Sequence, residues 1–390
     1  MQSMIAKTFV HARLCARGNV IDDGSLTVDE YGRITAVGSG LPSSQVTGET
    51  IDLQGQWLLP GLIDVHVHGG GGYDAMDGAY ESIEGISRYH AAHGTTSFLI
   101  TTTTDSEARI VEALKAADEA MTRGVSGAEP VGIHLEGPFI HESRRGAQLE
   151  AYILLPDQAL LERFERASGG RIRLVTLAPE VAGGLDAVRW YRSRGVRVSV
   201  GHSNATYEEV KLAVREGADH TTHHFNGMSP FHHRDPGVAG AGLLISELTT
   251  ELIADGFHVH PDVVKLLFQV KGGTGICLIT DALSCAGLPD GRYDGYESVI
   301  VNKGKVMLAD GSGLAGSTLT TWQAVVNVMN DTGLPLETVL PSATETPARQ
   351  AGVQARKGSL TPGKDADLIV VDEHMRLTRT FVRGTEIYSE

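Results

Sequence analysis

The middle of the chain alternates short apolar runs with amphipathic stretches. Eight runs have the length and composition of buried strands, and they cover residues 58–65, 96–101, 131–135, 172–177, 196–200, 220–223, 251–254 and 276–280. Apolar residues at helical spacing occur in segments 107–122, 157–166, 185–193, 207–216, 261–269 and 337–354. Strands that alternate with helices are typical of parallel βαβ units, and eight such units close a (β/α)8 barrel. A doubly wound open sheet is the alternative.

Both ends of the chain carry the pattern of β-structure. Short alternating runs at 25–28 and 33–37 are flanked by turn signals such as Asp22-Asp23-Gly24, and a run at 366–372 precedes a last turn and strand. We therefore predict an α/β protein with a TIM-like catalytic barrel over residues 58–355. The two ends, residues 1–57 and 356–390, are predicted to build one small β-sandwich module together.

Composition narrows the possible functions. The 390 residues leave room for a barrel of about 250 residues and a smaller second part. The 33 Lys and Arg against 48 Asp and Glu give a net charge of −15 without any basic run, so we expect no binding to nucleic acid or to an anionic membrane. Three cysteines without a C-x-x-C pair, no apolar leader and no membrane-length apolar run favour a cytoplasmic protein.

Side chains that can hold a metal ion fall at the ends of the predicted strands, where barrels of this kind carry their active sites. The first strand ends in His66-Val67-His68, and residues two apart on a strand face the same side, so both imidazoles can reach one ion. Further strands end in Glu136, His202, His223 and Asp281. Any one of these histidines can be read as a core residue, but the whole set indicates a metal centre. Imidazole and carboxylate without thiolate suit zinc or another first-row divalent ion.

Longer strings around these residues resemble a known family. They read HLEGPF at 134–139, GHSNAT at 201–206, THHFNGM at 222–228, ADGFHV at 254–259, TDAL at 280–283 and LAGSTL at 314–319. The ligand pattern is similar to that of the amidohydrolase superfamily. The strings, in this order, resemble its N-acetylglucosamine-6-phosphate deacetylases over nearly the whole chain.

The resemblance implies a set of metal ligands. Glu136, His202 and His223 would hold one ion, and members that keep the H-x-H pair are expected to hold a second through His66 and His68, with Glu136 as a bridge. Asp281 is placed at the same centre. We therefore expect two divalent ions for each chain. Zinc is the first candidate, and the same ligands also accept iron or manganese.

The resemblance also implies the reaction, the removal of acetate from N-acetyl-D-glucosamine 6-phosphate. A metal ion lowers the pKa of a bound water, and the resulting hydroxide would attack the acetamide carbonyl. Asp281 would take the proton of that water as general base and give it to the leaving amine as general acid.

Substrate contacts follow from the same likeness. Arg234 is the expected phosphate ligand, because guanidinium binds phosphate bidentately, and in the family this loop reaches across the interface of a homodimer. Asn226 and the backbone N–H of Gly227 would assist it, and His258 would contact the sugar. The small-residue segment Leu314, Ala315 and Gly316 would line the acetyl pocket.

One position departs from the family pattern. Gln148 stands where the family usually has a histidine that helps to hold the substrate carbonyl, and glutamine can donate only a neutral hydrogen bond. N-acetylgalactosamine 6-phosphate or another acetamido sugar phosphate is therefore kept as an alternative substrate. A cyclic-amide hydrolase is disfavoured because residues 171–180 contain no lysine, and a non-catalytic scaffold because every expected ligand is present.

Overall fold

Eight parallel strands form the central sheet of the computed structural model, which describes residues 5–16, 18–42, 48–295 and 298–390. In sheet order they are β15 (Ile276–Leu278), β14 (Thr249–Leu252), β13 (His220–Thr221), β12 (Arg197–Val200), β11 (Ile172–Leu177), β10 (Glu129–Glu136), β9 (Thr95–Thr102) and β6 (Leu62–Val67). Each lies beside the next strand along the chain, as in a (β/α)8 barrel. The predicted barrel is confirmed, and the open sheet is wrong.

The first and last strands of this sheet, β6 and β15, are not paired along their length. The barrel is closed between them by contacts of the residues that follow β15. Beyond β15, Ala282 forms a parallel bridge with Val67 of β6. The Asp281 N–H donates to the carbonyl of His66 at 3.0 Å, and the Thr280 hydroxyl donates to the buried Asp64 carboxylate at 2.6 Å. These contacts bring Asp281 directly beside the strand that ends in His66 and His68.

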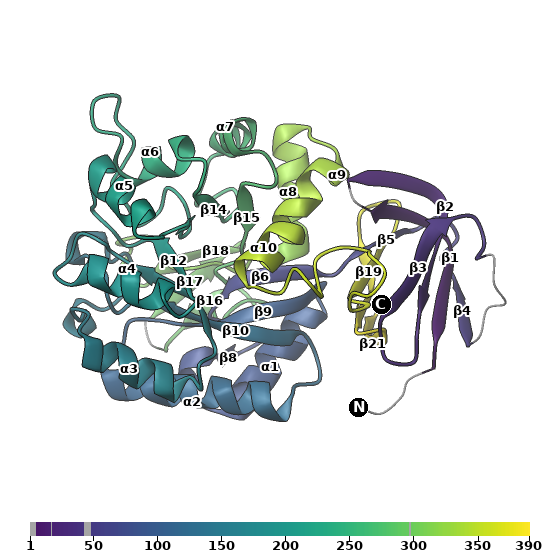
Figure 1. Cartoon of the computed structure of the whole chain (residues 1–390), viewed down its shortest axis with the longest axis horizontal. Coiled ribbons are helices and arrows are strands. Elements are labelled where there is room, and N and C mark those ends of the chain that lie inside the picture. Colours follow the sequence, from purple (N-terminus) through teal and green to yellow (C-terminus); the bar gives the residue numbers. More distant parts are fainter. Residues whose placement is uncertain (1–4, 17, 43–47, 296–297) are drawn as a thin grey trace.

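Helices surround the barrel, as Figure 1 shows. They are α1 (Tyr80–Ala91), α2 (Glu107–Arg123), α3 (Gln158–Ala167), α4 (Gly184–Arg192), α5 (Tyr207–Arg215), α6 (Gly237–Leu244), α7 (Pro261–Lys271), α8 (Thr321–Thr332), α9 (Leu336–Val339) and α10 (Glu345–Gln350). Short 3₁₀ turns lie at η1 (Ala75–Asp77), η2 (Glu142–Arg144), η3 (Glu150–Tyr152) and η4 (Leu340–Ala343). Local sequence explains several boundaries. The Thr206 side chain and the Glu209 side chain, for example, form a capping box at the start of α5.

One helix prediction is wrong. Segment 337–354 is three short pieces, α9, η4 and α10, and not one amphipathic helix. Pro341 and Pro347 lie inside the segment, and proline removes a backbone N–H donor and collides with the preceding turn of a helix. The other five predicted helices are present as α2, α3, α4, α5 and α7.

The two ends of the chain form a second, separate sheet at one side of the barrel (Figure 1). Its order is β21 (Thr385–Ser389), β20 (Leu377–Val382), β19 (Leu368–Val371), β5 (Trp57–Pro60), β1 (Lys7–Ala16), β2 (Asn19–Val28) and β3 (Ile34–Ser39), with β4 (Glu49–Asp52) also paired to β1. The rings of Phe9 and Phe381, from opposite ends of the sequence, meet edge to face at 5.1 Å. The prediction that both ends share one β-rich part is confirmed.

The first predicted barrel strand, 58–65, is two strands. Trp57–Pro60 pairs with β1 and β19 in the terminal sheet, whereas Leu62–Val67 pairs with β9 in the barrel. Gly61 lies between them, and a Cβ there would approach the Thr96 side chain to 2.3 Å. Only glycine lets the chain pass from one sheet to the other so close to β9. The residue limits 1–57, 58–355 and 356–390 remain a prediction.

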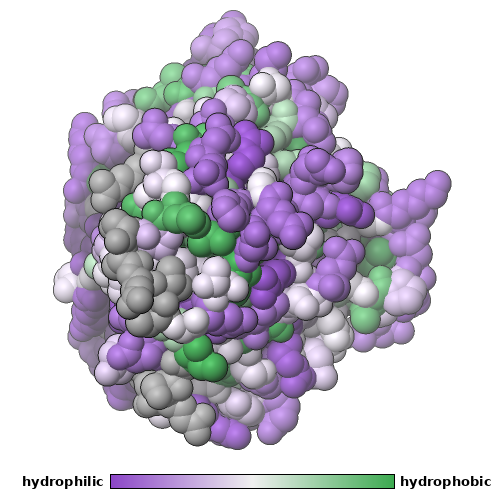
Figure 2. Space-filling model, turned by 90° about the vertical axis from the view of Figure 1, so that its right-hand side faces the viewer, coloured by the Kyte–Doolittle hydropathy of each residue, from purple (hydrophilic) through white to green (hydrophobic). Residues whose placement is uncertain are grey.

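Smaller strands lie at the mouth of the barrel. A three-stranded antiparallel sheet, β16 (Gly291–Tyr293), β17 (Val299–Asn302) and β18 (Lys305–Leu308), is inserted between β15 and α8, and β7 (Gly69–Gly70) pairs with β8 (Tyr73–Asp74). Figure 2 shows the end of the molecule that carries the terminal sheet, where hydrophilic side chains predominate and hydrophobic ones form small separate patches. In the described ranges, no helix is long and apolar enough to cross a membrane.

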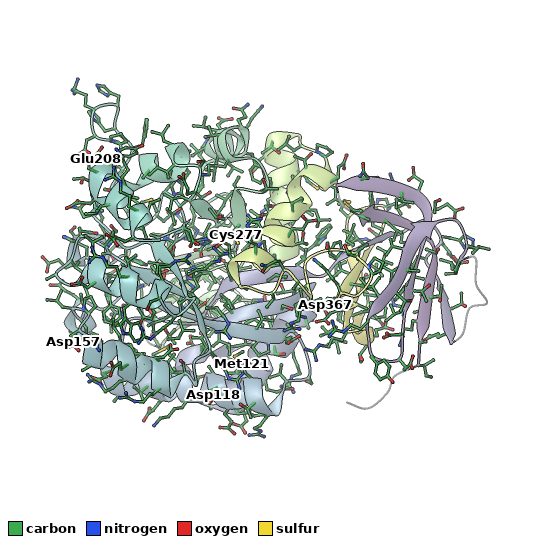
Figure 3. All side chains as sticks on the ribbon, viewed as in Figure 1. Asp118, Met121, Asp157, Glu208, Cys277 and Asp367 are labelled. Atoms are coloured by element: carbon green, nitrogen blue, oxygen red, sulfur yellow. The ribbon has the colours of Figure 1, made fainter. Side chains whose placement is uncertain are left out.

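A cluster of charged side chains joins the terminal sheet to the barrel, near Asp367 in Figure 3. The fully buried Lys357 ammonium pairs with Asp367 and, at 2.8 Å, with Glu129 at the start of β10. Arg356 holds the same glutamate at 2.6 Å. Burial opposes ionisation of Glu129, but Arg356 and Lys357 outweigh it and lower its pKa to about 2. The glutamate therefore stays charged and pairs with one buried cation, Lys357, and one half-buried cation, Arg356.

We expect Glu129→Gln to lower the free energy of unfolding by about 2–3 kcal/mol at pH 7, because it removes a carboxylate that Lys357 and Arg356 share and leaves them only Asp367 and Asp365 as partners. The folded-state pKa lies below the unfolded value, so this stabilisation is present above about pH 4.5 and is lost as the pH falls toward 2. Thermal unfolding of both proteins across this range checks it. Glu119→Gln, at an exposed pair with Arg123, is the control and should change little. A constant difference between pH 7 and pH 2.5 would contradict the assignment.

Candidate metal-dependent active site

A cavity of about 600 Å³ opens at the carboxyl-terminal ends of the barrel strands. Five of the six predicted metal-centre residues line it: His68, Glu136, His202, His223 and Asp281. The sixth, His66, is fully buried directly behind them, within 3.2 Å of His68. The structure therefore brings together all six residues that the strand-end pattern selected.

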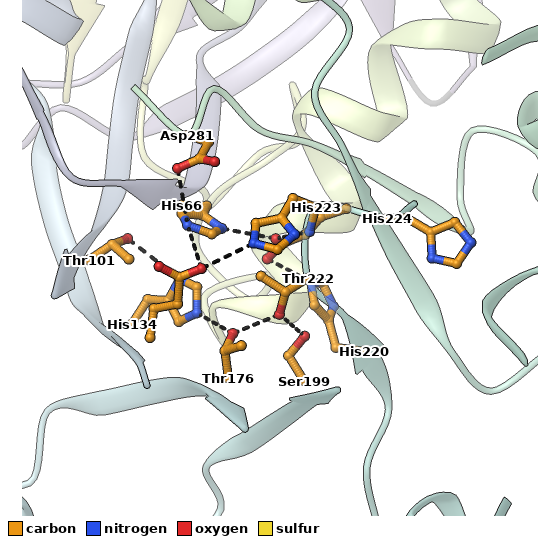
Figure 4. Close-up of polar contacts among 12 residues, drawn as sticks. His66, Thr101, His134, Thr176, Ser199, His220, Thr222, His223, His224 and Asp281 are labelled. Atoms are coloured by element: carbon orange, nitrogen blue, oxygen red, sulfur yellow. Dashed lines mark hydrogen bonds and ion pairs between the residues drawn. The ribbon is translucent and has the colours of Figure 1, made fainter. Parts of the chain in front are cut away.

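Three of these residues form a first cluster. The Nε2 atom of His66 lies 3.2 Å from Nε2 of His68 and 3.4 Å from Oδ1 of Asp281, and His68 Nε2 lies 3.2 Å from the same oxygen. Figure 4 shows the ring of His66 facing Asp281 across this short gap. Nitrogen and oxygen atoms from two strand ends thus meet at one point.

A second cluster forms around Glu136. Its Oε1 atom lies 3.2 Å from Nε2 of His202 and 3.3 Å from Nε2 of His223, and these two nitrogens are 3.0 Å apart. The other oxygen, Oε2, lies 3.3 Å from Nε2 of His68. One carboxylate therefore faces both clusters.

Hydrogen bonds at Nδ1 set the tautomer of three imidazoles. His202 Nδ1–H donates to the carbonyl of Arg144 at 2.9 Å, and His223 Nδ1–H donates to the carbonyl of Asn226 at 3.1 Å. His66 Nδ1 lies 3.0 Å from Glu251. With the proton held on Nδ1, the lone pair of each Nε2 points into the cluster, as metal-ligating histidines require. The donor set fits a divalent cation well, since imidazole lone pairs and carboxylate oxygens converge with no thiolate among them.

Both carboxylates in the clusters are held in the charged form. Burial opposes ionisation of Glu136, but the surrounding imidazoles, His66 first and then His202 and His223, hold its pKa well below the usual range. Burial likewise opposes ionisation of Asp281, and His66 and His68 overcome it and lower the pKa. Asp281 can therefore act as a proton acceptor at neutral pH.

Three of the clustered residues adopt a backbone conformation that side-chain-bearing residues rarely use. The φ angles are +46° at His202, +28° at His223 and +51° at Asp281. Each such residue costs on the order of 1–3 kcal/mol, and such positions concentrate at active sites. The strain marks the points at which the chain turns sharply off a strand and aims a side chain into the mouth.

The structure places seven of the eight predicted substrate contacts on the cavity wall. These are Gln148, Asn226, Gly227, His258, Leu314, Ala315 and Gly316. Arg234 is not among the lining residues. It lies on the exposed segment before α6, which projects away from the barrel in Figure 1. The geometry thus gathers seven predicted contacts around one cavity and leaves the predicted phosphate ligand, Arg234, outside it.

Gln148 is buried, and only one of the two polar atoms of its amide has a hydrogen-bond partner. Its Oε1 accepts from the Thr104 hydroxyl, whereas Nε2 has no partner within the part of the chain that the structure describes. A buried amide N–H without a partner costs about 1–3 kcal/mol, so this donor is available to a ligand in the cavity. His258, in contrast, is fixed through Nδ1 to the Asp255 carboxylate at 2.7 Å.

Several polar residues of the site escape prediction from the sequence. Arg109 is the one Arg or Lys on the described cavity wall, and Asp105 pairs with it at 2.9 Å. Beneath the clusters, a buried hydrogen-bonded chain runs from His134 through Thr176 and Thr222 to Ser199 (Figure 4). Glu251 on β14 is also fully buried. A carboxylate at the start of the run 251–254, whose other residues are apolar, is the signal that could have identified it.

The comparisons with known proteins agree with this geometry. A model described as the amidohydrolase family matches residues 57–387, and the chain belongs to this family. It is 41% identical over 367 residues to N-acetylglucosamine-6-phosphate deacetylase of Vibrio furnissii, with 94% of this chain and 91% of that protein covered. It is 38% identical over 372 residues to N-acetylgalactosamine-6-phosphate deacetylase of Escherichia coli O157:H7, with 95% and 97% covered.

A solved structure extends the likeness to the whole fold. A mutant of N-acetyl-D-glucosamine-6-phosphate deacetylase from Mycobacterium smegmatis, in complex with N-acetyl-D-glucosamine-6-phosphate, matches with a TM-score of 0.92 and 31% sequence identity. The match covers 99% of this chain and 100% of that one. The terminal sheet and the barrel are therefore shared, and not only the site.

Removal of metal with a chelator should lower the melting temperature, and Zn²⁺ should restore it, because a ligand that binds only the folded state stabilises it by about 4 kcal/mol at a thousandfold excess over Kd. Differential scanning calorimetry checks this. Mg²⁺ is the control ion and should give a much smaller rise, since imidazole is a poor ligand for it. In Glu136→Ala the Zn²⁺ effect should largely vanish, and an undiminished rise would contradict the role of Glu136.

Proposed function

We propose that this chain hydrolyses the acetamide of N-acetyl-D-glucosamine 6-phosphate to D-glucosamine 6-phosphate and acetate. The observation that carries the proposal is the meeting of His66, His68, Glu136, His202, His223 and Asp281 at the floor of one cavity. The similarity to deacetylases of this substrate, over more than nine tenths of the chain, supports it.

The proposed centre would hold two divalent ions, with Glu136, His202 and His223 as ligands of one and His66 and His68 as ligands of the other, and Glu136 would serve both. Both oxygens of Glu136 face imidazoles, which supports a bridge. Zinc is the first candidate, and iron or manganese would suit the same ligands. When bound, such ions polarise a carbonyl and make water a better nucleophile.

Asp281 is the proposed proton carrier. Its carboxylate is ionised, lies 3.2 Å from His68, and belongs to the cavity wall. It accepts a proton from the attacking water as the new C–O bond forms at the acetamide carbon. It then returns this proton to the amine nitrogen as the C–N bond breaks, so the carboxylate is regenerated at the end of the cycle.

The remaining wall residues are proposed to position the sugar phosphate. Asn226, the N–H of Gly227 and His258 offer donors to the phosphate and the ring hydroxyls, and Leu314, Ala315 and Gly316 leave space for the acetyl methyl. The unpaired Nε2 of Gln148 supports a hydrogen bond to the acetamide oxygen, in place of the imidazole that the family pattern has there.

The working unit is proposed to be a homodimer in which Arg234 contacts the phosphate of the partner subunit. Arg234 is exposed and lies outside its own cavity. Large apolar side chains near its loop and on the adjoining helices are also exposed: Phe231 at 55%, Leu244 at 61%, Leu266 at 46% and Val270 at 50%. Such a grouping of exposed apolar residues supports a protein interface on this side.

The second candidate substrate is N-acetylgalactosamine 6-phosphate, favoured by the 38% identity to a deacetylase of that epimer and by the departure at Gln148. The cytoplasm is the proposed location, where sugar phosphates are retained by their charge and the three buried cysteines stay reduced.

Asp281→Asn should keep the fold and lose nearly all turnover, because an amide cannot carry the proton. Acetate release from the glucosamine and galactosamine 6-phosphates, with the wild type as reference, checks both the reaction and the epimer. The variant should retain less than about a hundredth of kcat, as loss of a general acid–base group costs about 10²–10⁴-fold. Retention of a tenth of kcat would remove Asp281 from this role, and no acetate from either sugar with wild type would remove the function.

Arg234→Ala should raise KM for the phosphorylated sugar, and a mixture with Asp281→Asn should recover activity. In a mixed dimer, the site that keeps Asp281 receives Arg234 from the other subunit. Random pairing of equal amounts puts one complete site in half of the dimers, so activity measured at low substrate should reach about a quarter of wild type. If the mixture regains no activity after subunit exchange, Arg234 does not act across an interface.

A further inference from the structure

The seventh barrel strand supplies a buried carboxylate that belongs to neither ligand cluster. Glu251, on β14, is 0% exposed. Its Oε2 lies 3.0 Å from Nδ1 of His66 and accepts the backbone N–H of His223 at 2.9 Å. Its Oε1 lies 3.0 Å from Nε2 of His220. The carboxylate is thus tied at both oxygens, and one oxygen touches a residue of each cluster.

We propose that Glu251 is a shared positioning residue, which orients His66 of the first cluster and His223 of the second through a single carboxylate oxygen. The role rests on the proposed assignment of both clusters as metal ligands. Loss of Glu251 would therefore weaken metal binding at both clusters, even with Glu136 in place.

For His66 the contact acts on the ring. A carboxylate beside Nδ1 keeps the proton on that nitrogen, so the lone pair of Nε2 stays directed at the cluster. The negative charge also makes the imidazole a stronger donor to a cation. Without it, His66 can move its proton to Nε2 and cease to be a ligand.

For His223 the contact acts on the backbone. The residue has φ +28°, a strained conformation for any side chain. The N–H of His223 points at Glu251, and its Nδ1–H is fixed to the carbonyl of Asn226. The carboxylate therefore anchors the turn that carries the ring, while the ring itself is held from the other side.

His220 explains why the carboxylate does not swing away. It is the first residue of β13, and its Nε2 lies 3.0 Å from Oε1 of Glu251. Glu251 thus receives three donors from β6, β13 and the turn after β13, and none of these contacts reaches the cavity.

The test compares Zn²⁺ affinity in wild type, Glu251→Gln and Glu251→Leu, by competition of the metal-free proteins with a chromophoric chelator. Loss of an outer partner of a ligating histidine lowers metal affinity about 10–100-fold. We expect Glu251→Leu to weaken both binding steps by about this factor. Glu251→Gln can still accept from His66 and His223 but lacks the charge, so its loss should be about tenfold. Should Glu251→Leu not fold, Glu251→Gln carries the comparison.

A second experiment tests the contact of Glu251 with His223 separately, in a variant that lacks the first cluster. In His66→Ala/His68→Ala, only Glu136, His202 and His223 remain as the second cluster. Adding Glu251→Gln or Glu251→Leu to it should still weaken the remaining Zn²⁺ site several-fold, through the turn at His223. An unchanged affinity there would show that Glu251 serves His66 alone and would overturn the proposal.

Glu129→Gln is the matched control, since it also removes a mostly buried carboxylate from a barrel strand but at the opposite end of β10 from Glu136. It should lower the melting temperature of the metal-free protein and leave Zn²⁺ affinity unchanged. If the Glu251 variants behave like this control, the residue is only structural and the proposal is wrong. If wild type binds no Zn²⁺, the proposed metal centre itself fails, and this role with it.

Discussion

The structure of the site depends on one constraint, which is that a charged carboxylate is buried within it. The Glu136 carboxylate is 3% exposed, and an isolated charge in such a place costs several kcal/mol. It is tolerated because four imidazoles surround it, and these are in turn fixed by Glu251, two backbone carbonyls and Asp281. Because each of these contacts is at hydrogen-bond distance, the strand ends that carry the groups must meet closely. The barrel provides that convergence, since eight parallel strands direct their carboxyl ends to one mouth.

Much of this arrangement could be predicted from the sequence, because its signals are local. A strand period of two puts His66 and His68 on one face, and strand-end positions select Glu136, His202, His223 and Asp281. Strand and helix alternation then gives the barrel. The break in segment 337–354 also has a local signal, its two prolines. The helical spacing of the apolar residues predicts one helix there because it takes no account of them.

What could not be predicted depends on contacts between distant segments. The passage of the chain at Gly61 from one sheet to the other follows from the nearness of Thr96, which no local pattern reveals. Glu251 is read as an ordinary residue of a buried strand until His66 and His223 are seen beside it. The position of Arg109 on the wall, and of the strands β16 to β18 over the mouth, likewise depends on tertiary packing.

The sheet shared by both chain ends has a consequence for the order in which the protein is made. Strand β5 pairs on one edge with β1, which precedes it, and on the other with β19, which lies some three hundred residues later. At a synthesis rate of about 5–20 residues per second, that second edge waits roughly 15–60 seconds on the ribosome for its partner. The barrel can assemble during this interval, while the terminal sheet is completed last. An unpaired edge is prone to pairing with other chains, so the charged cluster around Lys357, which docks the final strands, also ends the period in which the new chain is most exposed to aggregation.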